Sequence, residues 1–136
     1  MRHVFADTSY WIAVLDPRDA LHARAKQVSQ DLGEFKLVTT EMILTELLNF
    51  FADAPDLKQV AAAAVGAIMQ DPNTEIVPQT SLQFRNAFDR YKSRTDKEWG
   101  LTDCASLLLM EQGGISEALT YDHHFEQAGF RALLRD

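Results

Sequence analysis

The stretch GLTDCASLLLMEQGG, residues 100–114, followed by EALT, residues 117–120, gives the clearest indication of how the chain folds. Apolar residues fall on every side of a helix over 100–114, which predicts a buried helix. EALT is typical of a short strand. The helix contains one acid, Asp103. An acid in the first turn suits the helix dipole, but a buried carboxylate is costly unless it is paired, hydrogen-bonded or bound to a metal.

Strand patterns alternate with helix patterns along the rest of the chain. Asp19 and Thr40 are the expected N-caps of the second and third helices. Further strands are expected over residues 3–6, 36–40, 74–79 and 130–134, and further helices over 9–16, 19–33, 41–53, 55–69 and 80–94. This alternation predicts an α/β fold, namely a three-layer α/β/α sandwich with a mainly parallel central sheet, in a single domain over residues 1–136.

The composition limits the class of protein. With 136 residues, 46% of them hydrophobic and 24% charged, the chain can bury a sizeable core. Its net charge of −7 argues against broad non-specific binding of nucleic acid, although a metal between acids and phosphate would still allow a nucleic-acid substrate. The single cysteine, Cys104, is expected to pack in the core. No signal peptide or membrane span is apparent, so we expect a cytoplasmic protein without membrane contact.

Four acids lie where a parallel sheet would bring them together. Sites in such sheets form beyond the carboxyl ends of the strands. Asp7 follows the first strand and Asp122 follows the strand over 117–120. Asp103 begins the preceding helix, and Glu46 lies two turns into the helix after the second strand. Each alone has a simpler interpretation, as a strand end, a helix start, a turn or a solvated surface residue.

Four carboxylates on one rim would repel one another and raise their pKa values, and a divalent cation would remove that repulsion. Oxygen ligands favour Mg²⁺ (or Mn²⁺) over zinc. His123 and His124 are adjacent and do not have zinc-site spacing, so we expect them in a solvated turn. They could also assist proton transfer or contact substrate.

A basic segment precedes Asp103. Residues 85–97 contain five basic residues against two acids, a local charge of +3, and this segment could follow a phosphate backbone. A helix surface with internal salt bridges is the alternative interpretation. The candidate phosphate-contacting residues are Arg85, Arg90, Lys92, Arg94 and Lys97.

Several segments together have a family likeness. They are FADTSYWIAVLD at 5–16, DALHARA at 19–25, TELLNFF at 45–51, DKEWGLTDCAS at 96–106 and LTYDHHFEQAGF at 119–130. In this order they resemble the PIN-domain ribonucleases, especially the VapC-like toxins of bacterial toxin–antitoxin pairs. The resemblance implies metal-dependent hydrolysis of RNA phosphodiester bonds. It implies that the catalytic and metal-binding residues are Asp7, Glu46, Asp103 and Asp122.

The resemblance also implies supporting hydroxyl groups and partners. Thr8 and Ser9 match the hydroxyl expected near the first acid. Gly100 stands where the family often has Ser or Thr, while Thr102 retains a hydroxyl near Asp103. The implied partners are an RNA substrate, a cognate antitoxin protein and a second copy of the chain in a homodimer.

Other functions remain to be compared with this one. A haloacid-dehalogenase-like phosphatase would need a second Asp at the position of Ser9, and a phosphorylation receiver would need an Asp after the third strand, within IVPQT. A non-enzymatic PIN scaffold that acts as a binding module stays open. So does a housekeeping PIN nuclease without a toxin role.

Overall fold

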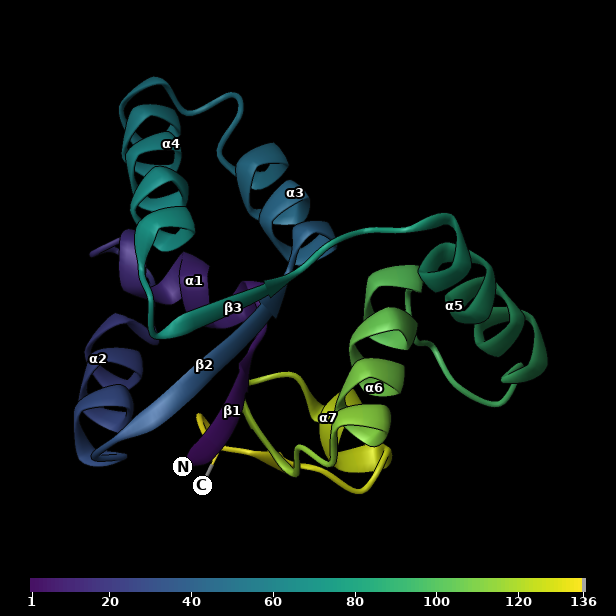
Figure 1. Cartoon of the computed structure of the whole chain (residues 1–136). Coiled ribbons are helices and arrows are strands. Elements are labelled where there is room, and N and C mark those ends of the chain that lie inside the picture. The colour runs from purple at the N-terminus through teal and green to yellow at the C-terminus, as the bar shows by residue number, and fades with distance from the viewer. Residues whose placement is uncertain (136) are drawn as a thin grey trace.

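The computed structural model describes residues 1–135, and five parallel strands form its central sheet (Figure 1). The strands lie in the order β3-β2-β1-β4-β5, and every neighbouring pair is parallel. The α/β fold class predicted from the sequence is therefore confirmed. The bounds are β1 Arg2–Ala6, β2 Phe35–Thr40, β3 Thr74–Val77, β4 Glu117–Leu119 and β5 Arg131–Ala132.

Helices cover both faces of this sheet. In Figure 1, α1 to α4 gather on one side, α6 and α7 lie on the other, and α5 packs against α6. The bounds are α1 Thr8–Leu15, α2 His22–Asp31, α3 Glu41–Phe50, α4 Pro55–Gln70, α5 Ser81–Ser93, α6 Leu101–Gly113 and α7 His123–Gln127. Within residues 1–135, no helix is long and apolar enough to cross a membrane.

The helix starts differ in part from those expected. Thr40 is the N-cap of α3 and accepts a hydrogen bond from the backbone of Ile43 at 3.0 Å, as predicted. Asp19 is not an N-cap, because its carboxylate accepts from the backbone of Leu21 within the turn that precedes α2. The segment 123–127, expected as a turn, is the short helix α7.

The last strand is shorter than expected. The sequence predicts a strand over 130–134, but only Arg131–Ala132 is paired as β5. Its neighbour β4 has three residues, which limits the ladder. The chain still continues beside the end of β4, because Leu134 donates a backbone hydrogen bond to Thr120 at 3.1 Å.

The direction in which strands are added to the sheet reverses between β1 and β4. From β1 the chain moves to β2 and β3 on one side, and later returns to β4 on the other side of β1. Ligands of open α/β sheets bind outside the carboxyl ends of strands at such a reversal. The backbone N–H of Asp7 donates to the carbonyl of Leu119 at 3.2 Å. Asp7 therefore lies beside the end of β4, at this reversal.

Candidate acidic metal site

Asp7 is the most buried acid of the predicted set. It lies directly after β1 at the N-cap of α1, and only 6% of the residue is exposed. Burial raises the pKa of its carboxyl from 3.8 to about 6, and the nearby charge of Asp103 contributes in the same direction. Such a carboxylate is stable in its charged form only with strong compensation.

Two hydroxyl groups hold the Asp7 carboxylate. Thr120 donates to Asp7 Oδ2 at 2.8 Å and Ser9 donates to the same oxygen at 3.1 Å. The Thr120 oxygen also accepts from the backbone N–H of Asp122 at 3.0 Å. Thr120, at the end of β4, thus connects two of the predicted acids.

Asp103 and Asp122 meet at one histidine. Nδ1 of His124 lies 3.2 Å from Oδ2 of Asp103 and 3.1 Å from Oδ1 of Asp122. Burial raises the pKa of Asp103, and the charge of Asp122 adds to this effect, while His124 opposes it. The backbone N–H of Gly100 donates to Asp103 at 3.0 Å, so the backbone holds this acid at a position without a hydroxyl side chain.

Glu46 reaches the site through Thr8. The Thr8 hydroxyl donates to Oε1 of Glu46 at 2.5 Å, so this hydroxyl binds Glu46 and not the neighbouring Asp7. Glu46 itself is exposed on α3. Thr8 follows Asp7 directly, which places the side of α3 that carries Glu46 beside the end of β1.

Not every predicted supporting residue has the expected contact. Ser9 contacts Asp7 as expected, and Thr8 contacts Glu46. Among the hydrogen bonds of residues 1–135, none joins the side chain of Thr102 to an acid, although Thr102 lies in the first turn of α6 beside Asp103. A second hydroxyl that donates to Asp7 belongs to the fully buried Thr120, which follows the neighbouring strand β4.

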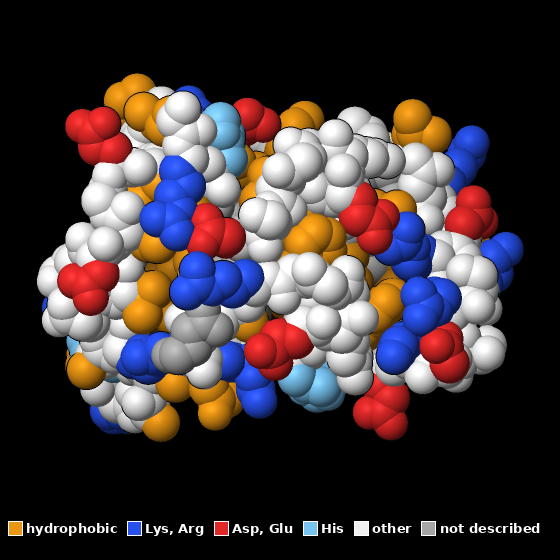
Figure 2. Space-filling view, turned by 90° about the horizontal axis from the view of Figure 1, so that it is seen from below, with side chains coloured by type: hydrophobic (Ala, Val, Ile, Leu, Met, Phe, Trp, Pro, Cys, Tyr) orange, Lys and Arg blue, Asp and Glu red, His pale blue; other side chains and the backbone are white. Residues whose placement is uncertain are grey.

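The predicted basic segment carries several ion pairs. At the right of Figure 2, where α5 lies, basic and acidic side chains are interspersed. Arg90 binds Glu111 of α6 through two hydrogen bonds of 2.9 Å, and Arg94 binds Asp96 through two of 3.0 Å. Lys92 lies 3.8 Å from Asp89. For these three residues the geometry favours the salt-bridged alternative, and RNA contact by Arg85, Arg90, Lys92, Arg94 and Lys97 stays a prediction.

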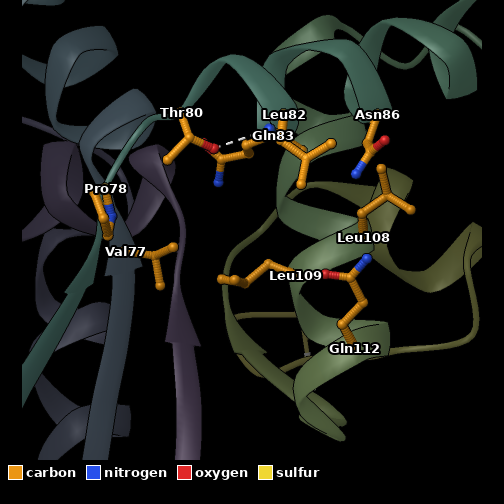
Figure 3. Close-up of a pocket in the computed structure, with 10 residues that line it drawn as sticks. Val77, Pro78, Thr80, Leu82, Gln83, Asn86, Leu108, Leu109 and Gln112 are labelled. Carbon is orange, nitrogen blue, oxygen red and sulfur yellow. Dashed lines mark hydrogen bonds between the residues drawn. The ribbon is translucent and has the colours of Figure 1, made fainter.

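A separate apolar cavity lies on the α5 side of the molecule. It has a volume of about 250 Å³ and lies between the end of β3, α5 and α6 (Figure 3). Leu82, Leu108 and Leu109 line much of it, and none of the four predicted acids does. This cavity is therefore distinct from the acidic site.

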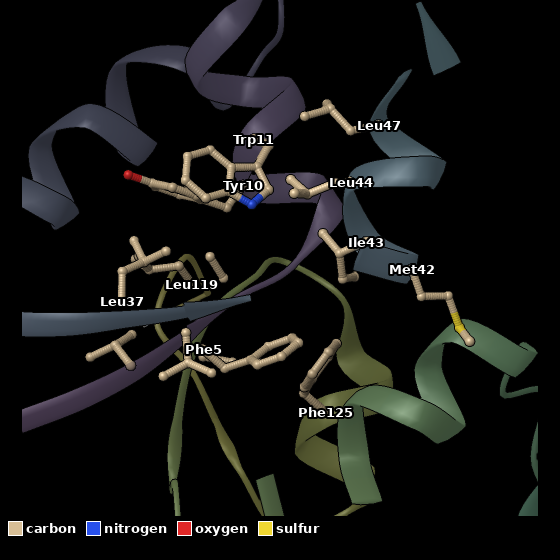
Figure 4. Close-up of a cluster of buried hydrophobic side chains, with 14 of the residues drawn as sticks. Phe5, Tyr10, Trp11, Leu37, Met42, Ile43, Leu44, Leu47, Leu119 and Phe125 are labelled. Carbon is tan, nitrogen blue, oxygen red and sulfur yellow. The ribbon is translucent and has the colours of Figure 1, made fainter. Parts of the chain in front are cut away.

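The helix α7 positions two residues of the site, and its anchor is Phe125. The Phe125 ring is fully buried, 6.2 Å from the ring of Phe5, inside the cluster shown in Figure 4. Burial of a phenylalanine contributes about 1.5–3 kcal/mol. Asp122 caps this helix by accepting from the backbone of His124 at 2.9 Å. From the sequence, Thr120 was not assigned to the site and His124 was expected in a solvated turn, with proton transfer or substrate contact as the alternative, although both stand in the same TYDHHF segment as Asp122.

Known proteins share this sequence and fold. The PIN domain family profile matches residues 4–131. The 23S rRNA-specific endonuclease VapC20 of Mycobacterium tuberculosis, from two strains, is 26% identical over 127 residues, covering 93% of this chain and 95% of the relative. The crystal structure of M. tuberculosis VapC20, described as a sarcin-ricin loop cleaving toxin, matches with a TM-score of 0.84 and 25% identity, over 93% of this chain and 95% of that one. The profile spans nearly the whole sequence, and this chain therefore belongs to the PIN domain family.

Proposed function

We propose that this chain is a divalent-metal-dependent endoribonuclease and the toxin of a toxin–antitoxin pair. The observation that carries the proposal is the buried Asp7 beside Asp103, with Asp122 and Glu46 joined to the same rim through Thr120 and Thr8. The fold and sequence of an endonuclease that acts on 23S rRNA support it. RNA is therefore the proposed substrate class.

The donor set fits a divalent metal ion. Asp7, Glu46, Asp103 and Asp122 would supply carboxylate oxygens, the ligands that Mg²⁺ and Mn²⁺ prefer. Among residues 1–135, no ion pair joins a Lys or Arg to any of these four acids, and the basic side chains beside them are His123 and His124. A bound ion would supply charge neutralisation, an activated water and support for the leaving oxygen.

The chain itself orients each acid. Thr120 and Ser9 fix Asp7, and Thr8 fixes Glu46. Backbone N–H groups fix the other two acids, from Gly100 to Asp103 and from His124 to Asp122. Because these contacts exist before substrate arrives, little orientational entropy remains to be lost at the reacting phosphate.

The first test is metal-dependent cleavage. The purified chain is expected to cut RNA in Mg²⁺ or Mn²⁺, to stop when EDTA is added, and to resume when either ion is restored. The substrates are a ribosomal RNA fragment and an unrelated structured RNA of equal length, which separates selective from general cleavage. Cleavage at an undiminished rate in EDTA would exclude the proposed mechanism.

The second test concerns the biological role. Expression of the chain in bacterial cytoplasm is expected to slow growth, because cleaved RNA cannot support translation, whereas an Asp7→Asn variant should be harmless. Co-expression of an adjacent small gene that encodes the proposed antitoxin should restore growth. A harmless wild-type chain that cuts RNA in vitro would indicate a housekeeping nuclease. A chain that neither cuts RNA nor slows growth would indicate a binding-only scaffold.

The proposed assembly is a homodimer with one antitoxin-binding site per copy. Light scattering of the purified chain measures the mass directly, and a monomer at micromolar concentration would contradict this part of the proposal.

A further inference from the structure

His124 lies between two acids of the site, with its ring nitrogen Nδ1 close to both Asp103 and Asp122. We propose that Nδ1 of His124 is a direct ligand of the divalent ion, so that the site contains nitrogen as well as oxygen. This inference rests on the proposed function, because it requires that the acids bind a metal.

The separations of the donor atoms fit adjacent ligands of one ion. Nδ1 of His124 lies 3.2 Å from Oδ2 of Asp103 and 3.1 Å from Oδ1 of Asp122. In an octahedral site with bonds of about 2.1 Å, neighbouring ligand atoms are about 3.0 Å apart. Asp122, His123 and His124 offer donor atoms that all lie within 4.8 Å of one another. An ion held there would bind Nδ1 of His124 together with Asp122, and the Asp103 carboxylate, 3.2 Å from Nδ1, would move towards it.

The ring is also held in place. Its side chain is 17% exposed, and the backbone of the same residue donates to Asp122 at 2.9 Å. The next residue, Phe125, is fully buried and anchors α7. The position of Nδ1 is thus determined by the packing of the helix, which limits the entropy lost when the ring binds a metal.

The neighbouring histidine provides a matched comparison. The side chain of His123 is 59% exposed, and its Nδ1 lies 3.7 Å from Asp122. Both histidines follow the same acid on the same short helix. Only His124, however, approaches Asp103 as well.

A nitrogen ligand has a consequence for metal preference. Neutral imidazole binds through Nδ1 when its proton is on Nε2. Nitrogen suits later first-row ions better than Mg²⁺, and affinity for a mixed site rises along the series that begins with Mn²⁺. We therefore expect His124 to favour Mn²⁺ over Mg²⁺.

Pulsed electron paramagnetic resonance of the Mn²⁺-loaded protein tests the ligand directly. The wild-type chain with one equivalent of Mn²⁺ should show electron spin-echo modulation from a coordinated ¹⁴N nucleus. Labelling of histidine with ¹⁵N should change this modulation, and that comparison needs no variant. His123→Ala should retain the modulation, and His124→Ala should lose it.

Calorimetric titration gives a second readout. His124→Ala is expected to lower Mn²⁺ affinity at least tenfold, roughly the loss seen when a contact to a metal site is removed, and to lower Mg²⁺ affinity by a smaller factor. His123→Ala should leave both affinities close to wild type. Circular dichroism shows whether each variant is folded.

The outcomes separate this inference from the proposed function. The wild-type chain could bind Mn²⁺ without histidine modulation, and Asp103→Asn could lose that Mn²⁺. This result would overturn the role of His124 and leave the proposed metal-dependent nuclease intact. A wild-type chain that binds neither ion would overturn both. Histidine coupling that persists in folded His124→Ala would also overturn the assignment.

Discussion

Replacement of Asp7 by Asn is expected to reduce RNA cleavage at least a thousandfold, which is roughly the loss on removal of an essential catalytic group. The same change should raise the stability of the metal-free protein. The loss of cleavage and the gain in stability have one cause. The Asp7 carboxylate would bind the ion, and without an ion it is a buried charge that destabilises the folded state. An acid with a purely structural role would lose stability when neutralised.

The pH dependence of unfolding follows from the pKa of Asp7. Its carboxyl has a pKa of about 6 in the folded chain, against 3.8 as the ordinary value. The unfolded state therefore loses its proton first as the pH rises from about 4 to about 6, and the folded state becomes less stable over that range. About two pKa units correspond to about 3 kcal/mol, a cost that is fully present above pH 6. Asn cannot ionise and does not bear this cost.

Part of the gain will be offset. In the wild type, the backbone N–H of Thr8 donates a hydrogen bond to the Asp7 carboxylate. In Asp7→Asn, one of the two carboxylate oxygens becomes an NH₂ group, which cannot accept a hydrogen bond. The net increase in the free energy of unfolding should therefore stay below the full electrostatic cost.

Urea unfolding in EDTA between pH 4 and pH 8 measures this effect. The difference between Asp7→Asn and wild type should be small at pH 4, grow up to about pH 6 and then stay constant. Asp53→Asn, at an exposed position, is the matched control and should match wild type throughout. An Asp7→Asn variant that is less stable than wild type above pH 6 would contradict the electrostatic argument.

The sequence was sufficient for the fold and for the acids that follow strand ends. Asp7 and Asp122 could be placed because the end of a parallel strand has a fixed position at the rim of the sheet. The Arg90–Glu111 pair could not be predicted, because it joins α5 and α6 across 21 residues of sequence and depends on how those helices pack. A local count of charges contains no such information.

The sequence also did not indicate which threonine hydroxyl contacts an acid of the site. Thr102 is next to Asp103 in sequence, whereas Thr120 is 113 residues from the carboxylate that it contacts. Only the pairing of β1 with β4 brings Thr120 to Asp7. His124 was expected in a solvated turn for a related reason. Asp and His residues in TYDHHF are typical of a turn, whereas burial of Phe125 makes the segment a helix.

Thr120→Val is expected to weaken metal binding and metal-dependent cleavage at pH 7 by about 10–100-fold, the usual effect of removing a partner that orients a ligand. Valine has nearly the same shape, and the side chain is fully buried, so the fold should persist. The change removes the donor to Asp7 and the acceptor for the N–H of Asp122, which costs about 1–3 kcal/mol for a buried group left without a partner.

The pH profile distinguishes this role of Thr120 from simple packing. The Thr120 hydrogen bond lowers the pKa of Asp7, so its loss should raise that pKa above its value of about 6. Protons would then compete with the metal up to a higher pH, and the midpoint of Mn²⁺ binding against pH should move upward in Thr120→Val. Thr120→Ser keeps the hydroxyl and should behave like wild type. Ser9→Ala removes the longer hydrogen bond of 3.1 Å and should shift the midpoint less than Thr120→Val does.

If Thr120→Ser loses as much metal affinity as Thr120→Val, the methyl group and not the hydroxyl positions Asp7. An unchanged midpoint in Thr120→Val would show that burial alone determines the proton affinity of Asp7.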